Sequence, residues 1–166
     1  MPPPETNLDA QADAIRILDS HRIMAIATNR PDGWPQNTIV GYANVGLRIY
    51  FMVFRLSQKQ ANISKDPRVA IAVGNEPAAL TLLEAVYAGA SAAEVTDPAE
   101  REFAWKLLSE RHSNLSDYQL PEGGEAAIVR ASCKFVSVLN YRKHFGRPVE
   151  FAMEETEPRE TSSADA

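Results

Sequence analysis

Residues 47–59 read Leu-Arg-Ile-Tyr-Phe-Met-Val-Phe-Arg-Leu-Ser-Gln-Lys. The first eight of them, residues 47–54, are rich in β-branched and aromatic side chains, which favours a strand. The run from Ser57 to Lys65 is predicted to be a short helix, because Asp66-Pro67 would end it. The stretch therefore predicts a buried strand that leads directly into a helix.

The start of this helix has the composition of an anion site. Ser57 is the predicted N-cap and Gln60 completes the form of a capping box, so two backbone donors would be satisfied locally and others would face an anion. The helix dipole adds about half a positive charge, and Lys59 and Arg55 supply full charges. A terminal phosphate would fit here. The same residues also suit a helix whose serine only caps and whose cations are solvated.

The segments on either side follow a definite order. They are an apolar strand at 22–29, a turn at Pro31-Asp32-Gly33, a strand at 34–42, a turn at 44–46, the strand and helix above, and Asp66-Pro-Arg-Val leading an apolar strand to Gly74. This ordered set resembles the FMN-binding split barrel of the pyridoxamine 5'-phosphate oxidase-like family. The resemblance continues through residues 87–95, a helix at 97–112 and a last strand near 134–141.

Periodicity predicts a mainly β fold. The apolar segments are long and joined by tight turns, which indicates about six antiparallel strands closed into a barrel, with helices at its periphery. The length of 166 residues suits one domain. We expect a flexible N-terminus at 1–7, a single split-barrel domain at 8–152 and a disordered acidic tail at 153–166.

Composition excludes several classes of function. The net charge of −5 and the pI near 5.2 argue against a nucleic-acid binder or a binder of anionic membranes. Cys133 is the single cysteine, so no intrachain disulfide is possible, and its apolar surroundings in sequence predict a core thiol. Residues 1–5 lack the features of a signal peptide and no apolar run is long enough to span a membrane, so a cytoplasmic protein is expected.

The usual catalytic and metal motifs are missing from the sequence. His21, His112 and His144 are far apart and have no metal-ligand spacing, which argues against a zinc site. The sequence holds no Gly-x-Ser-x-Gly elbow, Walker loop or Gly-x-Gly-x-x-Gly fingerprint. No catalytic side chain is therefore predicted.

The resemblance implies a set of cofactor contacts. In that family one strand lies along the flavin ring, a pair on the next strand contacts the cofactor, and a Ser-x-Lys segment holds its phosphate. The matching residues are, in that order, Asn37, Thr38, Ile39 and Val40; Phe51 and Met52; Ser57, Gln58 and Lys59. Glu84 lies near a position where the oxidase has a flavin-contacting glutamine. Core packing is the alternative for Phe51 or Met52, because strand side chains alternate between faces.

The chain departs from the oxidase in its cations. Gln36-Asn37 and Gln58 stand where the oxidase has arginines, and Arg55 is a candidate to replace one of them. Residues 140–147 lack the oxidase's C-terminal arginine-rich segment. The resemblance therefore implies the general stress protein branch of the family rather than a true pyridoxamine 5'-phosphate oxidase.

The function so predicted is an FMN-dependent oxidoreductase that acts on a small molecule, as a homodimer with FMN at the subunit interface. Trp105 and Tyr141 are candidates for contacts from the second subunit. Flavin carries the redox chemistry itself, which agrees with the missing catalytic motif. There are three alternatives: a non-enzymatic flavin-binding stress-response module, a deazaflavin-binding relative and a haem-binding relative. A deazaflavin with its polyanionic tail would require a basic groove. For haem, only the three histidines could be axial ligands.

Overall fold

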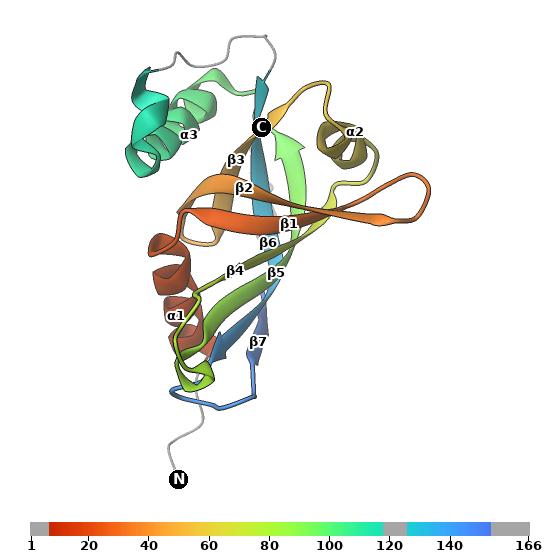
Figure 1. The fold of residues 1–166 in the computed structure, drawn as a ribbon. Coiled ribbons are helices and arrows are strands. Elements are labelled where there is room, and N and C mark those ends of the chain that lie inside the picture. Colours follow the sequence, from red (N-terminus) through yellow and green to blue (C-terminus); the bar gives the residue numbers. More distant parts are fainter. Residues whose placement is uncertain (1–6, 118–125, 154–166) are drawn as a thin grey trace, which may run out of the picture.

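An antiparallel barrel forms the body of the protein. The computed structural model describes residues 7–117 and 126–153, and within them seven strands form one sheet in the order β3-β2-β1-β4-β5-β6-β7. Strand β3 also pairs with β6, which closes six strands into a barrel and leaves β7 beside β6 (Figure 1). The strands are β1 (Ile23–Asn29), β2 (Pro35–Val45), β3 (Arg48–Phe54), β4 (Arg68–Gly74), β5 (Glu84–Glu94), β6 (Ala126–Asn140) and β7 (Val149–Ala152). The predicted mainly β split barrel is confirmed.

Alternation along each strand separates the core from the outer face. On β3, Ile49, Phe51 and Val53 point into the main core inside the barrel, whereas Tyr50 and Met52 belong to a second apolar cluster on the outside. A strand places successive side chains on opposite faces, so one strand serves both clusters. The outer cluster is covered by a helix.

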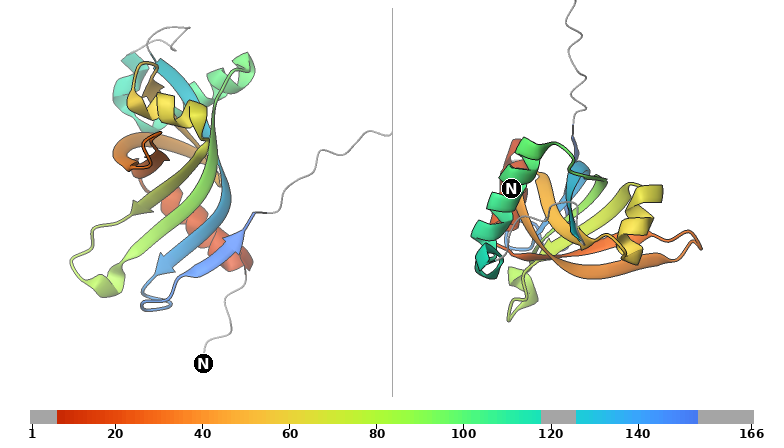
Figure 2. Two further views of the ribbon diagram at one scale, coloured as in Figure 1. Left: turned by 90° about the vertical axis from the view of Figure 1, so that its right-hand side faces the viewer. Right: turned by 90° about the horizontal axis from the view of Figure 1, so that it is seen from above.

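In the described part of the chain, three helices pack around the barrel: α1 (Asn7–Asp19), α2 (Gln58–Lys65) and α3 (Pro98–Arg111), with short 3₁₀ turns η1 (Leu80–Leu82) and η2 (Ser113–Asp117). Asp97 caps α3 as predicted, because its Oδ2 accepts a hydrogen bond of 2.8 Å from the backbone N–H of Glu100. Figure 1 shows α1 and α3 on one side of the barrel and α2 on the other. The β1–β2 hairpin projects past the barrel on the side of α2 (Figure 2).

The ends of some elements differ from the prediction. Strand β6 begins at Ala126, so it contains the apolar strand pattern of residues 127–139 around Cys133 and starts before the predicted last strand near 134–141. The short strand β7 is not among the predicted strands. Helix α1 begins at Asn7, the last residue of the predicted flexible segment. The predictions for residues 1–6 and for the tail from residue 154 lie outside the described residues. Among the helices of the described residues, none has the length and apolar character needed to cross a membrane.

Candidate functional site

The start of α2 is capped, but not by a full capping box. The backbone N–H of Gln60 donates to Ser57 Oγ at 3.2 Å, while the Ser57 hydroxyl donates to the Phe54 carbonyl at 2.6 Å. A capping box also needs a hydrogen bond from the Ser57 N–H to the Gln60 side chain, and this bond is absent within the described residues. The Ser57 N–H donates to the Phe54 carbonyl instead, and the buried Gln60 Oε1 has no partner. The prediction that two backbone donors are satisfied by the box was therefore wrong. One is satisfied, and the first-turn N–H groups of Gln58 and Lys59 make no hydrogen bond within the described part of the chain.

Lys59 is the cation available at this helix start. Its side chain is half-buried and makes no ion pair or hydrogen bond with the residues that the structure describes. Burial lowers the pKa of the Lys59 ammonium below its usual value, because desolvation penalises the charged form. An ammonium that is partly desolvated and unpaired would be stabilised by an anion.

Arg55 is already engaged. Its guanidinium makes two hydrogen bonds to the Glu94 carboxylate, at 2.7 and 3.1 Å, and both side chains are partly buried. A bidentate pair of this kind holds both charges in a fixed geometry. The positive charge of Arg55 is thus balanced by Glu94, and Lys59 supplies an uncompensated charge at the start of α2.

A buried amide joins α2 to the barrel. Asn62 is 0% exposed, and its Nδ2 donates to Thr28 Oγ1 and to Gln36 Oε1, both at 3.0 Å. Its Oδ1 accepts a hydrogen bond of 2.8 Å from Gln58 Nε2. This network fixes the first turn of α2 against β1 and β2. The sequence analysis did not single out Asn62, whose signal is a polar residue within a short helix on the side that faces the barrel.

The predicted strand residues divide between the two faces of the barrel. Phe51 is 0% exposed and lies in the main core, so the core-packing alternative holds for its side chain. Met52 faces outward, as do Asn37 and Ile39. Between them, Thr38 and Val40 turn inward, and Thr38 Oγ1 is buried without a partner in the described structure. The outward face of β2 and β3 thus continues to the start of α2.

Glu84 is not part of this grouping within one chain. It lies at the first residue of β5, whereas Glu94 beside Arg55 is the last. Its carboxylate binds Arg16 through hydrogen bonds of 2.8 and 3.2 Å, and its N–H donates to Asn75 Oδ1 at 2.9 Å. The structure brings Ser57, Gln58 and Lys59 together but keeps Glu84 at the far end of the barrel.

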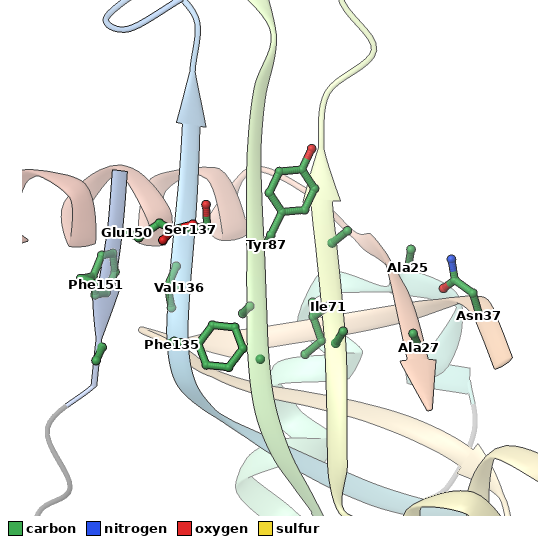
Figure 3. A pocket seen from close by; sticks show the side chains of 15 residues that line it. Ala25, Ala27, Asn37, Ile71, Tyr87, Phe135, Val136, Ser137, Glu150 and Phe151 are labelled. Carbon is green, nitrogen blue, oxygen red and sulfur yellow. The ribbon is translucent and has the colours of Figure 1, made fainter. Parts of the chain in front are cut away.

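A broad groove runs over the outer face of β1, β4, β5, β6 and β7 and reaches Asn37 on β2. It has a volume of about 700 Å³, and its floor consists mainly of small residues, with the Phe135 ring over β5 (Figure 3). A Cβ on Gly89 would lie 2.1 Å from that ring, so only glycine lets Phe135 lie against the strand. Phe135 is nevertheless 62% exposed. The sequence analysis missed this groove; its signal is the alternation of alanine with larger apolar residues at 25–27 and 70–72.

The closed six-stranded barrel and the capped helix after its third strand define a split barrel. The family model described as "Pyridoxamine 5'-phosphate oxidase" matches residues 9–138. The chain therefore belongs to the pyridoxamine 5'-phosphate oxidase family. No curated protein matches it in sequence.

Solved structures share the fold at low sequence identity. A haem-binding protein from Mycobacterium smegmatis has a TM-score of 0.75 and 18% identity over 92% of this chain, which spans only 60% of that protein. General Stress Protein 26 from Bacillus anthracis has a TM-score of 0.66 and 15% identity, over 86% of this chain and 98% of its own. A FAD-binding protein from Mesorhizobium loti has a TM-score of 0.63 and 18% identity, over 81% and 94%. These likenesses show the fold.

Proposed function

We propose that the protein is an FMN-binding flavoprotein that oxidises or reduces a small molecule. The observation that carries this proposal is the half-buried, unpaired ammonium of Lys59 beside two free backbone donors at the start of α2. A helix N-terminus with an uncompensated cation suits a phosphate monoester. The outward strand face next to it is apolar and exposed, with Ile39 at 65% and Phe54 at 70%, which suits a flat ring system.

Each residue of the proposed site has a separate task. The N–H groups of Gln58 and Lys59 and the Lys59 ammonium would hold the phosphate. The network of Asn62 fixes the position of these donors before the ligand arrives, which lowers the entropic cost of binding. The backbone of residues 37–40 would hold the polar edge of the ring. Bound flavin supplies hydride or electron transfer, so the protein contributes binding and orientation.

The proposed substrate is not pyridoxamine 5'-phosphate. Gln36 and Gln58 are neutral side chains, and each is hydrogen-bonded to Asn62, Gln36 through its Oε1 and Gln58 through its Nε2. Arg55 is balanced by Glu94. At the start of α2, Lys59 is the uncompensated cation among the described residues, and it would be used by the phosphate of the cofactor, which leaves no second cation there for a phosphate on the substrate.

A homodimer with flavin at the subunit interface is part of the proposal. The groove on the outer sheet face supports it, because its small residues let another surface approach closely while Phe135 and Tyr87 offer exposed aromatic area. A second copy of the chain is the occupant that we assign to this face. A partner would also supply the wall that the exposed strand face of β2 and β3 lacks in one chain.

A titration of the purified protein with FMN, FAD and riboflavin tests the cofactor. We expect FMN to bind more tightly than FAD, because adenosine would have to be accommodated beyond the phosphate. We expect riboflavin to bind more weakly than FMN, since it lacks the phosphate that Lys59 would bind. Flavin fluorescence gives the dissociation constants. Equal or tighter binding of FAD, or a haem Soret band in the purified protein, would overturn the FMN assignment.

A further inference from the structure

A second cavity lies between the outer face of the barrel and the end of α3. It has a volume of about 220 Å³ and is lined by Gly41, Met52, Leu108, His112, Asn114 and Leu115. It is separate from the broad groove, with which it shares no lining residue. Three of the six lining residues have apolar side chains, and none of the described residues that line the cavity is a lysine, arginine, aspartate or glutamate.

His112 is held against β2 in a defined orientation. A Cβ on Gly41 would lie 3.0 Å from Cε1 and 3.2 Å from Nε2 of the ring, so glycine at this position allows the imidazole to lie against the strand. Nε2 lies 2.9 Å from the Tyr42 carbonyl oxygen. Because a carbonyl only accepts, Nε2 carries the proton and donates. In the neutral form of the ring that makes this bond, Nδ1 carries a lone pair, and Nδ1 has no partner within the described residues.

This cavity lies at the far end of the proposed flavin strand from the phosphate site. Gln36 bonds to Asn62, which places the start of β2 beside α2. Gly41 follows five residues later, about 16 Å further along a strand that rises about 3.3 Å per residue. Ile39 shares the outward face with Gly41, so a flavin with its phosphate at α2 and its ring along β2 would bring the ring towards the cavity.

We infer that this cavity is a substrate subsite for an uncharged molecule about the size of one six-membered ring with a small substituent. The inference rests on the proposed flavin function. A cavity of about 150 Å³ is known to hold benzene, so about 220 Å³ leaves room for a substituent. Met52, Leu108 and Leu115 supply apolar contact, and Nδ1 of His112 accepts a hydrogen bond from the ligand. A phosphate or carboxylate would lose its hydration here without meeting a fixed cation, and is rejected.

Phenol, anisole and benzoate are matched probes for this subsite. Each is titrated into the FMN-loaded protein, with the methyl resonance of Met52 as the reporter. Phenol is expected to shift this resonance saturably. Anisole, which lacks the donor, is expected to bind about two- to tenfold more weakly. Benzoate is expected to give no saturable shift. Absence of a saturable phenol shift, or equal affinities for phenol and benzoate, overturns the inference.

A filled cavity gives the second arm of the test. Leu115→Trp is expected to lower phenol affinity at least tenfold, and Leu82→Trp on η1 is the control because Leu82 does not line the cavity. Phenol affinity unchanged in Leu115→Trp overturns the inference. A flavin titration on the same samples separates the two proposals. FMN binding without phenol binding rejects the subsite alone, and phenol binding without FMN binding rejects the flavin function and with it the substrate role.

Discussion

The Nδ2 of Asn62 donates a hydrogen bond of 3.0 Å to Oε1 of Gln36, and so ties α2 to the start of β2. The same amide donates to Thr28 and accepts from Gln58, which leaves no buried polar atom of Asn62 unsatisfied. A fully satisfied buried amide is rigid, because every alternative orientation would lose hydrogen bonds in a low-dielectric site. The position of the free donors at α2 therefore depends on this residue.

Asn62→Leu is expected to lower the free energy of unfolding by about 1–3 kcal/mol, since it leaves buried partners unsatisfied. Thr28→Val should cost less, because Asn62 then keeps its bond to Gln36. Urea denaturation measures both. We also expect Asn62→Leu to reduce the ratio of the riboflavin to the FMN dissociation constants, because the phosphate site would lose its alignment. An unchanged ratio would show that Asn62 has only a structural role.

Lys59→Ala is expected to weaken FMN binding by about 1.5–3 kcal/mol, the usual worth of a hydrogen bond to a charged group, while the fold stays intact. Riboflavin affinity should change little, since riboflavin has no phosphate. Arg55→Ala should cost less than Lys59→Ala, because Arg55 is paired with Glu94. Fluorescence titration measures these affinities. If Lys59→Ala left FMN affinity intact, the helix start would be a cap and not a phosphate site.

Lys59 should also affect the stability of the flavin-free protein in a pH-dependent way. Burial lowers the pKa of Lys59 in the folded state. Between this lowered pKa and the unfolded pKa of about 10.5, the unfolded chain therefore binds more protons at Lys59 than the folded protein does. The contribution of Lys59 to stability is therefore unfavourable at neutral pH and improves as pH rises through the lowered pKa. Lys59→Met should raise the melting temperature at pH 7 and remove this improvement. A lower melting temperature for Lys59→Met at pH 7 would contradict the prediction.

Glu94→Gln is expected to tighten FMN binding several-fold. The substitution removes the negative charge that balances Arg55, so the guanidinium becomes a second uncompensated cation near α2. Glu76→Gln changes the net charge equally but lies beyond the opposite end of β4, and it should leave the dissociation constant unchanged. Equal effects of the two variants would indicate that only the overall charge matters.

The sequence predicts the strands and helix starts well where the signals are local. The aromatic strand at 47–54, the Asp97-Pro98 start of α3 and the stop after Lys65 each depend on neighbours in sequence, and each is found close to its predicted place. Strand β7 is too short to carry a periodic signal, and it exists because it pairs with β6 across a loop. Pairing of this kind cannot be read from a window of residues.

The candidate site is predictable only in part, for the same physical reason. Ser57 and Lys59 are placed by a local helix start. The partner of Arg55 lies 39 residues away. Glu84 is the first residue of β5, so it lies at the other end of the barrel, where it pairs with Arg16, 68 residues away. Asn62 looks like an ordinary polar helix residue until the fold buries it. Charge balance and amide networks follow from tertiary contacts, which the sequence does not display.

Phe135→Lys is expected to convert the proposed dimer to a monomer. Phe135 lies on the outer sheet face over Gly89 and is largely exposed in one chain, so the variant should fold, while two lysines brought to a shared apolar surface would be desolvated at high cost. Leu80→Lys on η1 is the control, because Leu80 is similarly exposed but lies away from the groove. Sedimentation velocity at low micromolar concentration measures the oligomeric state. If Phe135→Lys stays a dimer with the sedimentation coefficient of the unaltered protein, this face is not the interface. If the unaltered protein is a monomer that keeps stoichiometric FMN, the flavin needs no second subunit.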